Sequence, residues 1–254
     1  MVLASASAGL VDAIVGGGGL IIVPSLFGLF PQALPATLLG TNKAASVWGT
    51  GWAAWQYAQR VRLPSARLWG AMAAALAGAM LGAWLATHVP AAPFRLALPG
   101  VLAAVWLYTL WRKDLGHAHA PHLSHRQETL AATAIGAGIG FYDGIFGPGT
   151  GSFFVFALVR GLGWDFLHAS AAAKRLNFAT NVAALAWFIP HGHVVWALSL
   201  PMAVANVAGS ALGTRLALRH GTGFVRVAFL VVVGALILKT GWDARTAWEG
   251  LQLP

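Results

Sequence analysis

The residues most able to do chemistry in this chain are four charged side chains inside otherwise apolar stretches: Asp12, Lys43, Asp143 and Lys174. An ionisable group in a hydrocarbon environment is costly unless it is paired or hydrated, so each of the four is a candidate functional residue. The two lysines could supply positive charge to an anion. Alternatively, each lysine extends to a membrane surface, because both lie near the start of their segments.

Polar residues follow each lysine at helical spacing. Positions three and seven residues after a lysine lie on its face of a helix, and they hold Ser46 and Thr50 in one case and Asn177 and Asn181 in the other. Two such stripes facing each other would form a cationic, hydrogen-bonding site for an anion. Asn206, in a later apolar segment, either lines the same pathway or bonds a neighbouring helix. The expected substrate-binding side chains are Lys43, Lys174, Asn42, Ser46, Asn177 and Asn181.

Two glycine-rich runs, at residues 16–19 and 147–151, interrupt long apolar segments. Neither is a P-loop, because the first run is not followed by Lys and Ser or Thr, and the second lacks a preceding strand and the alternation of an α/β domain. One interpretation is a re-entrant turn, in which a second short helix begins near Gly18 and near Gly149 and points its free N–H groups at an anion. The other interpretation is close helix packing by small residues. The sequence leaves both open.

The two aspartates, Asp12 and Asp143, precede these glycine runs by the same spacing. Either of them could carry a coupling proton. They could equally cap the short helices or pair with a buried cation. We favour the structural role, because capping needs only what the sequence contains.

The elements that position these residues are apolar segments of membrane-spanning length. Hydrophobic residues make up 58% of the 254 residues and charged residues 9%, against about 25% charged in a soluble domain. This composition predicts an integral membrane protein, and the absence of cysteine excludes thiol chemistry and disulfides.

Basic residues lie mostly between apolar segments, which indicates contact with anionic lipid rather than nucleic acid. Six segments can each form a spanning helix of about 20 residues: 37–59, 68–89, 94–111, 166–189, 194–218 and 224–240.

The chain also repeats itself at a constant offset of 131 residues, which relates Asp12 to Asp143 and Lys43 to Lys174. The linker and the other loops that carry Lys or Arg are expected in the cytoplasm, whereas the loop at 190–193 has neither residue and is expected on the other side. This topology requires each broken segment to turn back on itself. The expected fold is therefore an all-α polytopic membrane protein of two inverted structural repeats. Each repeat contains a glycine-broken helical hairpin and three spanning helices. The expected boundaries are 1–111, a cytoplasmic linker at 112–128, and 129–254; the alternative is eight plain spans in parallel repeats.

The motifs in both halves resemble the sulfite exporter TauE/SafE family. The first repeat matches at residues 12–20, with Pro24, and at 40–43. The second repeat matches at residues 140–153 and at 173–174, with Asn177 and Asn181. The resemblance covers almost the whole chain. It implies a transporter of anionic sulfur compounds or small organic anions, such as sulfite or a sulfonate.

The sequence thus predicts a secondary transporter, an exporter, in a bacterial inner membrane, with a passive anion channel or a non-transporting scaffold as alternatives. No catalytic constellation is present, so we expect neither an enzyme nor a cofactor. The expected partners are a small anionic substrate, the lipid bilayer and a coupling ion, H+ or Na+; a homodimer stays open. No metal site is expected, and a histidine cluster in the linker is interpreted as a solvated loop: His117, His119, His122 and His125.

Overall fold

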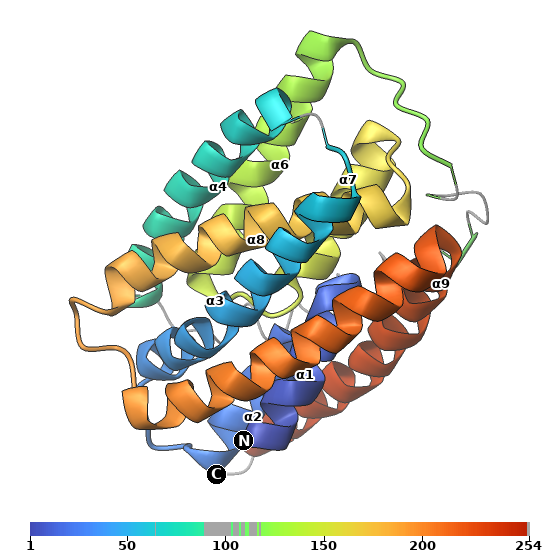
Figure 1. The fold of residues 1–254 in the computed structure, drawn as a ribbon. Coiled ribbons are helices and arrows are strands. Elements are labelled where there is room, and N and C mark those ends of the chain that lie inside the picture. The colour runs from blue at the N-terminus through green and yellow to red at the C-terminus, as the bar shows by residue number, and fades with distance from the viewer. Residues whose placement is uncertain are drawn as a thin grey trace.

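The computed structural model describes residues 1–63, 65–88, 103, 107, 110–111, 116 and 118–252, and this part of the chain is helical with short connections (Figure 1). The all-helical expectation is confirmed there. The expected span at 94–111 lies largely outside the described residues. The helices are α1 (Val2–Val15), α2 (Gly19–Leu29), α3 (Pro35–Arg60), α4 (Ser65–Ala86), α6 (His125–Ile145), α7 (Thr150–Leu162), α8 (Phe166–Phe188) and α9 (Trp196–Gln252).

Both glycine runs break their segments into two helices, as expected. Three of these helices are short, with 14, 11 and 13 residues, but α6 has 21 residues and is longer than the short helix expected there. Gly16, which follows α1, has φ 85° and Gly149, which precedes α7, also has φ 85°. This left-handed conformation is open to glycine without strain. The second helices begin immediately after Gly18 and Gly149.

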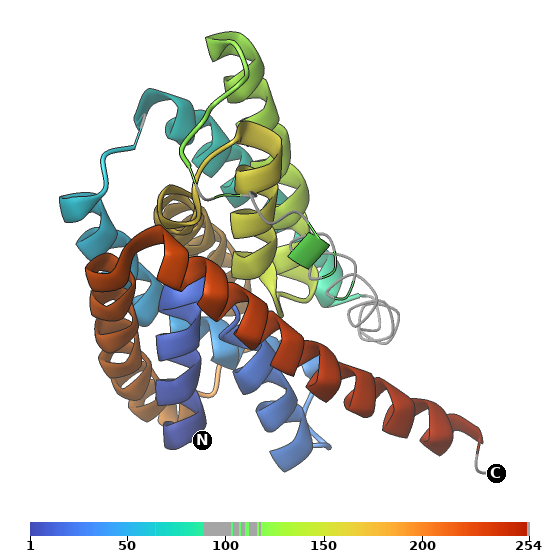
Figure 2. The same ribbon diagram turned by 90° about the vertical axis from the view of Figure 1, so that its right-hand side faces the viewer.

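The expected spans at 194–218 and 224–240 are the two arms of α9. Gly221 has φ 72° and ψ −163°, which is not helical, and the chain folds back there. Figure 2 shows the red C-terminal arm turning away from the orange arm at this point. Two stretches of the described chain combine the length and hydropathy of a membrane span: Leu68–Ala86 in α4 and Trp196–Ala235 in α9.

The helices are arranged as a central pair with a flanking pair on either side (Figure 1). Helices α3 and α8 cross in the centre, α4 packs against α6, and α1 packs against α9. Glycines bring the flanking helices into backbone contact: a Cβ on Gly140 would lie 2.5 Å from the carbonyl oxygen of Ala75, and one on Gly209 would lie 1.9 Å from that of Ala6. Such contacts are typical of helix packing in membranes, where small residues let backbones approach closely.

The two broken segments touch each other near the middle of the molecule. A Cβ on Gly16 would lie 2.2 Å from the carbonyl carbon of Gly151, so the two backbones leave no room for a side chain. The Ser152 backbone N–H donates to the Gly16 carbonyl oxygen at 3.1 Å, and the Ser152 hydroxyl donates to the Val15 carbonyl oxygen at 3.0 Å. Close packing is therefore one use of these glycines. Anion binding by the helix N-termini at Gly18 and Gly149 stays a prediction.

Candidate functional site

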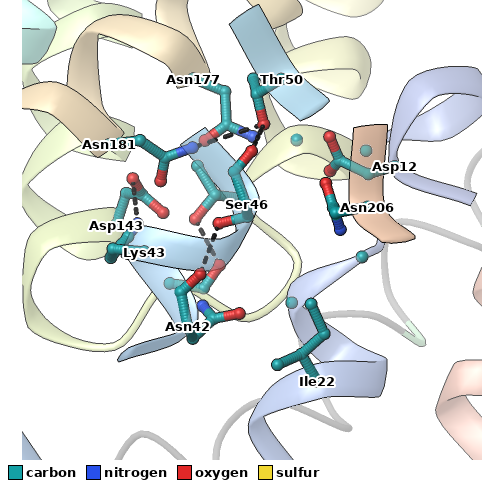
Figure 3. Close-up of a pocket in the computed structure, with 16 residues that line it drawn as sticks. Asp12, Ile22, Asn42, Lys43, Ser46, Thr50, Asp143, Asn177, Asn181 and Asn206 are labelled. Carbon is teal, nitrogen blue, oxygen red and sulfur yellow. Dashed lines mark hydrogen bonds and ion pairs between the residues drawn. The ribbon is translucent and has the colours of Figure 1, made fainter. Parts of the chain in front are cut away.

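A small polar cavity lies between the crossing helices and the two breaks (Figure 3). The cavity has a volume of about 20 Å³, enough for one or two water molecules. Of the side chains expected from the sequence, Lys174 does not line this cavity, and neither does Gly149. The lining residues are Asp12, Gly16, Gly18, Gly19, Ile22, Asn42, Lys43, Ser46, Thr50, Asp143, Gly147, Thr150, Gly151, Asn177, Asn181 and Asn206.

The polar stripe on α3 faces the cavity because its members share one side of the helix. The Ser46 hydroxyl donates to the Asn42 carbonyl oxygen at 2.8 Å, and the Thr50 hydroxyl donates to the Ser46 carbonyl oxygen at 2.9 Å. These bonds occupy the hydroxyl protons and leave oxygen lone pairs as acceptors. The Oδ1 atom of Asn42 is buried and has no hydrogen-bond partner among the described residues. This oxygen is therefore an acceptor that is available to a donor group in the cavity.

The stripe on α8 meets the stripe on α3 inside the cavity. Asn181 Nδ2 donates to Thr50 Oγ1 at 3.5 Å, a long hydrogen bond. These two residues are 131 positions apart, so they occupy equivalent places in the two halves of the sequence. The expectation that the stripes lie opposite each other is met at this contact.

Lys43 forms an ion pair with an aspartate from the other half of the chain (Figure 3). Its Nζ atom lies 2.5 Å from Asp143 Oδ2, and the two side chains are 4% and 2% exposed. Both residues line the cavity. This lysine is buried beside a carboxylate rather than extended to a membrane surface, so the surface alternative is wrong for Lys43.

Lys174 forms the reciprocal pair with Asp12, at 2.9 Å from Oδ2. Its ammonium group also donates to the Asp12 backbone carbonyl oxygen. The Lys174 side chain is fully buried, whereas the Asp12 side chain is 12% exposed and reaches the cavity. The surface alternative is therefore wrong for Lys174 as well.

The aspartates thus pair with buried cations, one of the roles that the sequence left open. They do not cap the short helices, since neither α2 nor α7 has a side-chain cap. A role in coupling stays a prediction. The pairing across halves was not foreseeable from spacing along the chain, because the partners lie 100 and 162 positions apart.

The sequence left open whether Asn206 faces the polar site or bonds a neighbouring helix, and in the structure it does both. It lines the cavity, and its Nδ2 donates to the Ser5 carbonyl oxygen at 3.1 Å. Its Oδ1 lies against Gly49 of α3, where a Cβ would be 2.0 Å away. Thr150, at the start of α7, also lines the cavity and was not among the expected site residues. Its position beside the second break was the signal that could have identified it.

Comparison with known proteins gives consistent matches along the chain. The family model described as "Sulfite exporter TauE/SafE" matches residues 1–240. A Sinorhizobium sp. protein named probable membrane transporter protein ORF9 is 38% identical over 234 residues, which cover 91% of this chain and 87% of that protein. The probable membrane transporter protein YfcA of Escherichia coli strain K12 is 35% identical over 240 residues, which cover 93% of this chain and 87% of that protein.

A further relative, a probable membrane transporter protein of Haemophilus influenzae, is 32% identical over 237 residues. These residues cover 93% of this chain and 91% of that protein. No solved structure matches the chain.

The helical fold, the buried polar cavity and these relatives together define a multi-helix membrane transporter. The chain belongs to the sulfite exporter TauE/SafE family. Its location is therefore the membrane, and the names of the family and of its relatives indicate a transporter rather than an enzyme.

Proposed function

We propose that this protein is a secondary transporter that exports a small anionic sulfur compound or organic anion, such as sulfite or a sulfonate. The observation that carries the proposal is the Lys43–Asp143 ion pair at the wall of a cavity lined by amides and hydroxyls. An oxyanion needs a cation and several hydrogen-bond donors, and Lys43, Asn42, Asn177 and Asn181 supply both.

The empty site is formally neutral, because each lysine is matched by one aspartate. In the proposed exchange, an anion binds Lys43 by replacing Asp143 as its partner. A buried carboxylate left without a cation is strongly destabilised. Uptake of a proton or Na+ by Asp143 removes this cost, so that anion and coupling ion bind together. This exchange gives Asp143 a coupling role and leaves Asp12 as a brace for Lys174.

Several contacts favour the inverted-repeat arrangement. The ion pairs are reciprocal under the offset of 131 residues, since Lys43 pairs with Asp143 and Lys174 with Asp12. The equivalent helices α3 and α8 run in opposite directions (Figure 1), and Thr37 near the start of α3 lies 3.2 Å from His193 beyond the end of α8. Two equivalent helices of opposite direction are what an inverted repeat requires.

The proposed topology places the linker at 112–128 in the cytoplasm and the loop around His191 on the other side. His119 lies against Asp165 at the start of α8, and His191 follows its end. The 23 residues of α8 span roughly 34 Å at 1.5 Å per residue, close to the ~30 Å of a bilayer core. Within the second repeat, α6 begins at His125, slightly before the proposed boundary at residue 129.

The narrow cavity favours a transporter over a passive channel. A space of about 20 Å³ accepts a water molecule or two but no sulfonate, so substrate entry requires helices to move. The two halves also differ, because Lys43 lines the cavity and Lys174 does not. In a transporter with inverted repeats, the two halves exchange environments between inward-open and outward-open states.

The proposal is tested with purified protein in proteoliposomes loaded with sulfite, thiosulfate, sulfoacetate or a simple carboxylate. We expect saturable efflux of at least one anion, accelerated when H+ or Na+ is more concentrated inside the vesicles than outside, because the anion and the coupling ion bind together. A flux that rises linearly with concentration and ignores both gradients would indicate a channel. Absence of flux and of binding for all four anions would contradict the substrate class.

The coupling role is tested by comparing Asp143→Asn with its repeat equivalent, Asp12→Asn. We expect Asp143→Asn to exchange substrate between equal pools but to lose acceleration by the ion gradient. Asp12→Asn serves as the matched control, since it removes the same charge from the other pair, and it should keep gradient-driven transport if it folds. Equal gradient dependence in Asp143→Asn and the parent protein would show that this carboxylate does not carry the ion.

A further inference from the structure

A cluster of two imidazoles and a carboxylate lies at the start of α8, away from the cavity. The residues are His119 from the linker, Asp165 immediately before α8, and His168 in its first turn. One ligand atom from each lies within 4.8 Å of the others. The transport mechanism proposed above uses none of them.

Asp165 is held rigidly and presents one oxygen to the histidines. Its Oδ1 accepts hydrogen bonds from the backbone N–H groups of Leu167 at 2.8 Å and His168 at 3.0 Å, and from the Thr222 hydroxyl at 3.0 Å. Its Oδ2 faces the Nδ1 atoms of His168 at 2.5 Å and His119 at 3.5 Å. Hydrogen bonds of this kind to a ligating carboxylate are typical of the outer shell of metal sites.

His119 is also held in place, although it belongs to the linker. The Ala120 N–H donates to the Gly163 carbonyl oxygen at 2.9 Å, and the Phe166 N–H donates to the Gly116 carbonyl oxygen at 3.1 Å. These two backbone bonds fix the linker on either side of His119 against the start of α8. The ring also contacts Trp164, with centroids 6.0 Å apart.

The contacts around Trp164 extend this support. Trp164 Nε1–H donates to Glu128 Oε1 at 2.9 Å, and both side chains are buried. The imidazole of His119 is thus placed against a packed wall rather than on a free loop.

We propose that His119, Asp165 and His168 bind a divalent transition-metal ion of the Zn2+ class. Metal–ligand bonds of about 2.0–2.2 Å in a tetrahedron place ligand atoms roughly 3.3 Å apart. The separation of His119 and Asp165 already matches this value, and His168 has to move from Asp165 by less than ~1 Å to match it. The imidazoles are 37% and 31% exposed, so solvent reaches the fourth coordination position.

A single metal ion can bind all three ligand atoms of this cluster. Both Nδ1 atoms address the same oxygen of Asp165, and the two rings lie 4.4 Å apart. One divalent cation binds all three ligands together. The chain contains no cysteine, and imidazole with carboxylate is a ligand set that suits zinc.

The metal would join two segments that are distant along the chain and lie next to a third. It would tie the linker to the start of α8, and Thr222 connects Asp165 to the bend of α9 at Gly221. Lys174 lies further along the same helix α8. The sequence suggested a solvated linker here because it has no cysteine and only Asp114 and Glu128 as nearby carboxylates. The carboxylate of the cluster comes instead from Asp165.

The test is a titration of the full-length purified protein, stripped with a chelator, with Zn2+ alone and with Co2+ alone. We expect one Zn2+ per chain by calorimetry, a rise in thermal stability, and an intense visible absorption band with Co2+. His119→Gln and His168→Gln should each weaken Zn2+ binding at least tenfold. The matched control is His125→Gln, an exposed histidine of the same linker that should leave the affinity unchanged.

Two results would overturn this site. One is a parent protein with no saturable Zn2+ binding and no intense Co2+ band, which does not depend on how any variant folds. The other is equal Zn2+ affinity in the parent and in the folded double variant His119→Gln/His168→Gln, which would place the metal on other residues. Neither outcome bears on the anion site at Lys43.

Discussion

The two buried lysine–aspartate pairs are built from equivalent residues but have different surroundings. Lys43 and Asp143 both line the cavity, with side chains 4% and 2% exposed. Lys174 is fully buried behind Asp12 and donates to both its carboxylate and its backbone carbonyl oxygen. The same two residue types thus form a pair whose lysine reaches the cavity, here called the accessible pair, and a pair whose lysine does not, here called the enclosed pair. The difference shows that repeat symmetry in a sequence does not make the two copies equal in one conformation.

The enclosed pair provides the largest expected effect. Lys174→Met leaves the Asp12 carboxylate and its carbonyl oxygen without their partner, and removal of one member of a buried ion pair costs about 3–5 kcal/mol. We expect a large loss of thermal stability and of inserted protein, measured by thermal unfolding in detergent. The double variant Lys174→Met/Asp12→Leu should recover much of the stability, because it leaves no unpaired charge. If Lys174→Met is as stable as the parent protein, the Lys174–Asp12 pair does not brace the fold.

The contact between the two helix breaks lies beside both lysine–aspartate pairs. Its contribution to stability can be tested at Gly16 and Gly149, two glycines with the same φ of 85°. In Gly16→Ala, the new Cβ meets the Gly151 backbone at 2.2 Å, whereas in Gly149→Ala the nearest atom is 3.5 Å away. Left-handed strain costs about 1–2 kcal/mol at either site, and overpacking adds about 1–3 kcal/mol at Gly16 alone. Urea or thermal unfolding of the two variants should therefore rank Gly16→Ala as clearly less stable. Equal stabilities would mean that the breaks separate easily.

The accessible pair should affect binding more than folding. We expect Lys43→Met/Asp143→Leu to fold, because it removes both charges together. Its affinity for a transported anion should fall at least about tenfold, or 1.4 kcal/mol, through loss of a charge-assisted contact. The single variant Lys43→Arg should also bind the anion more weakly than the parent protein, since the planar guanidinium group is larger than an ammonium group. Calorimetric titration with the anion identified by efflux measures this effect, and unchanged affinity would exclude Lys43 from the site.

The comparison also separates what the sequence could predict from what it could not. The helix breaks were predictable because glycine runs act locally, and the stripes at Ser46 and Asn177 followed from helical periodicity. The partners of the lysines were not predictable, because they depend on how two breaks cross in space. The exclusion of Lys174 from the cavity was hidden for the same reason: residue type and spacing are identical at Lys43, and only packing against Asp12 distinguishes them.

The smallest expected effect lies at the contact between the two stripes, where Thr50 and Asn181 meet. Thr50→Val removes the hydroxyl that accepts from Asn181 at 3.5 Å and donates to the Ser46 carbonyl oxygen at 2.9 Å. Because the first bond is long and the Ser46 carbonyl is in a helix, the loss should be only about 0.5–1 kcal/mol, the net value of an ordinary hydrogen bond. Ser46→Ala is the matched control, since it removes a hydroxyl one turn earlier without touching Asn181. If transport accelerates in Thr50→Val while stability falls no more than in the control, this contact restrains the movement of α3 against α8. A loss of stability several times larger than in Ser46→Ala would instead make the contact a structural anchor of the central pair.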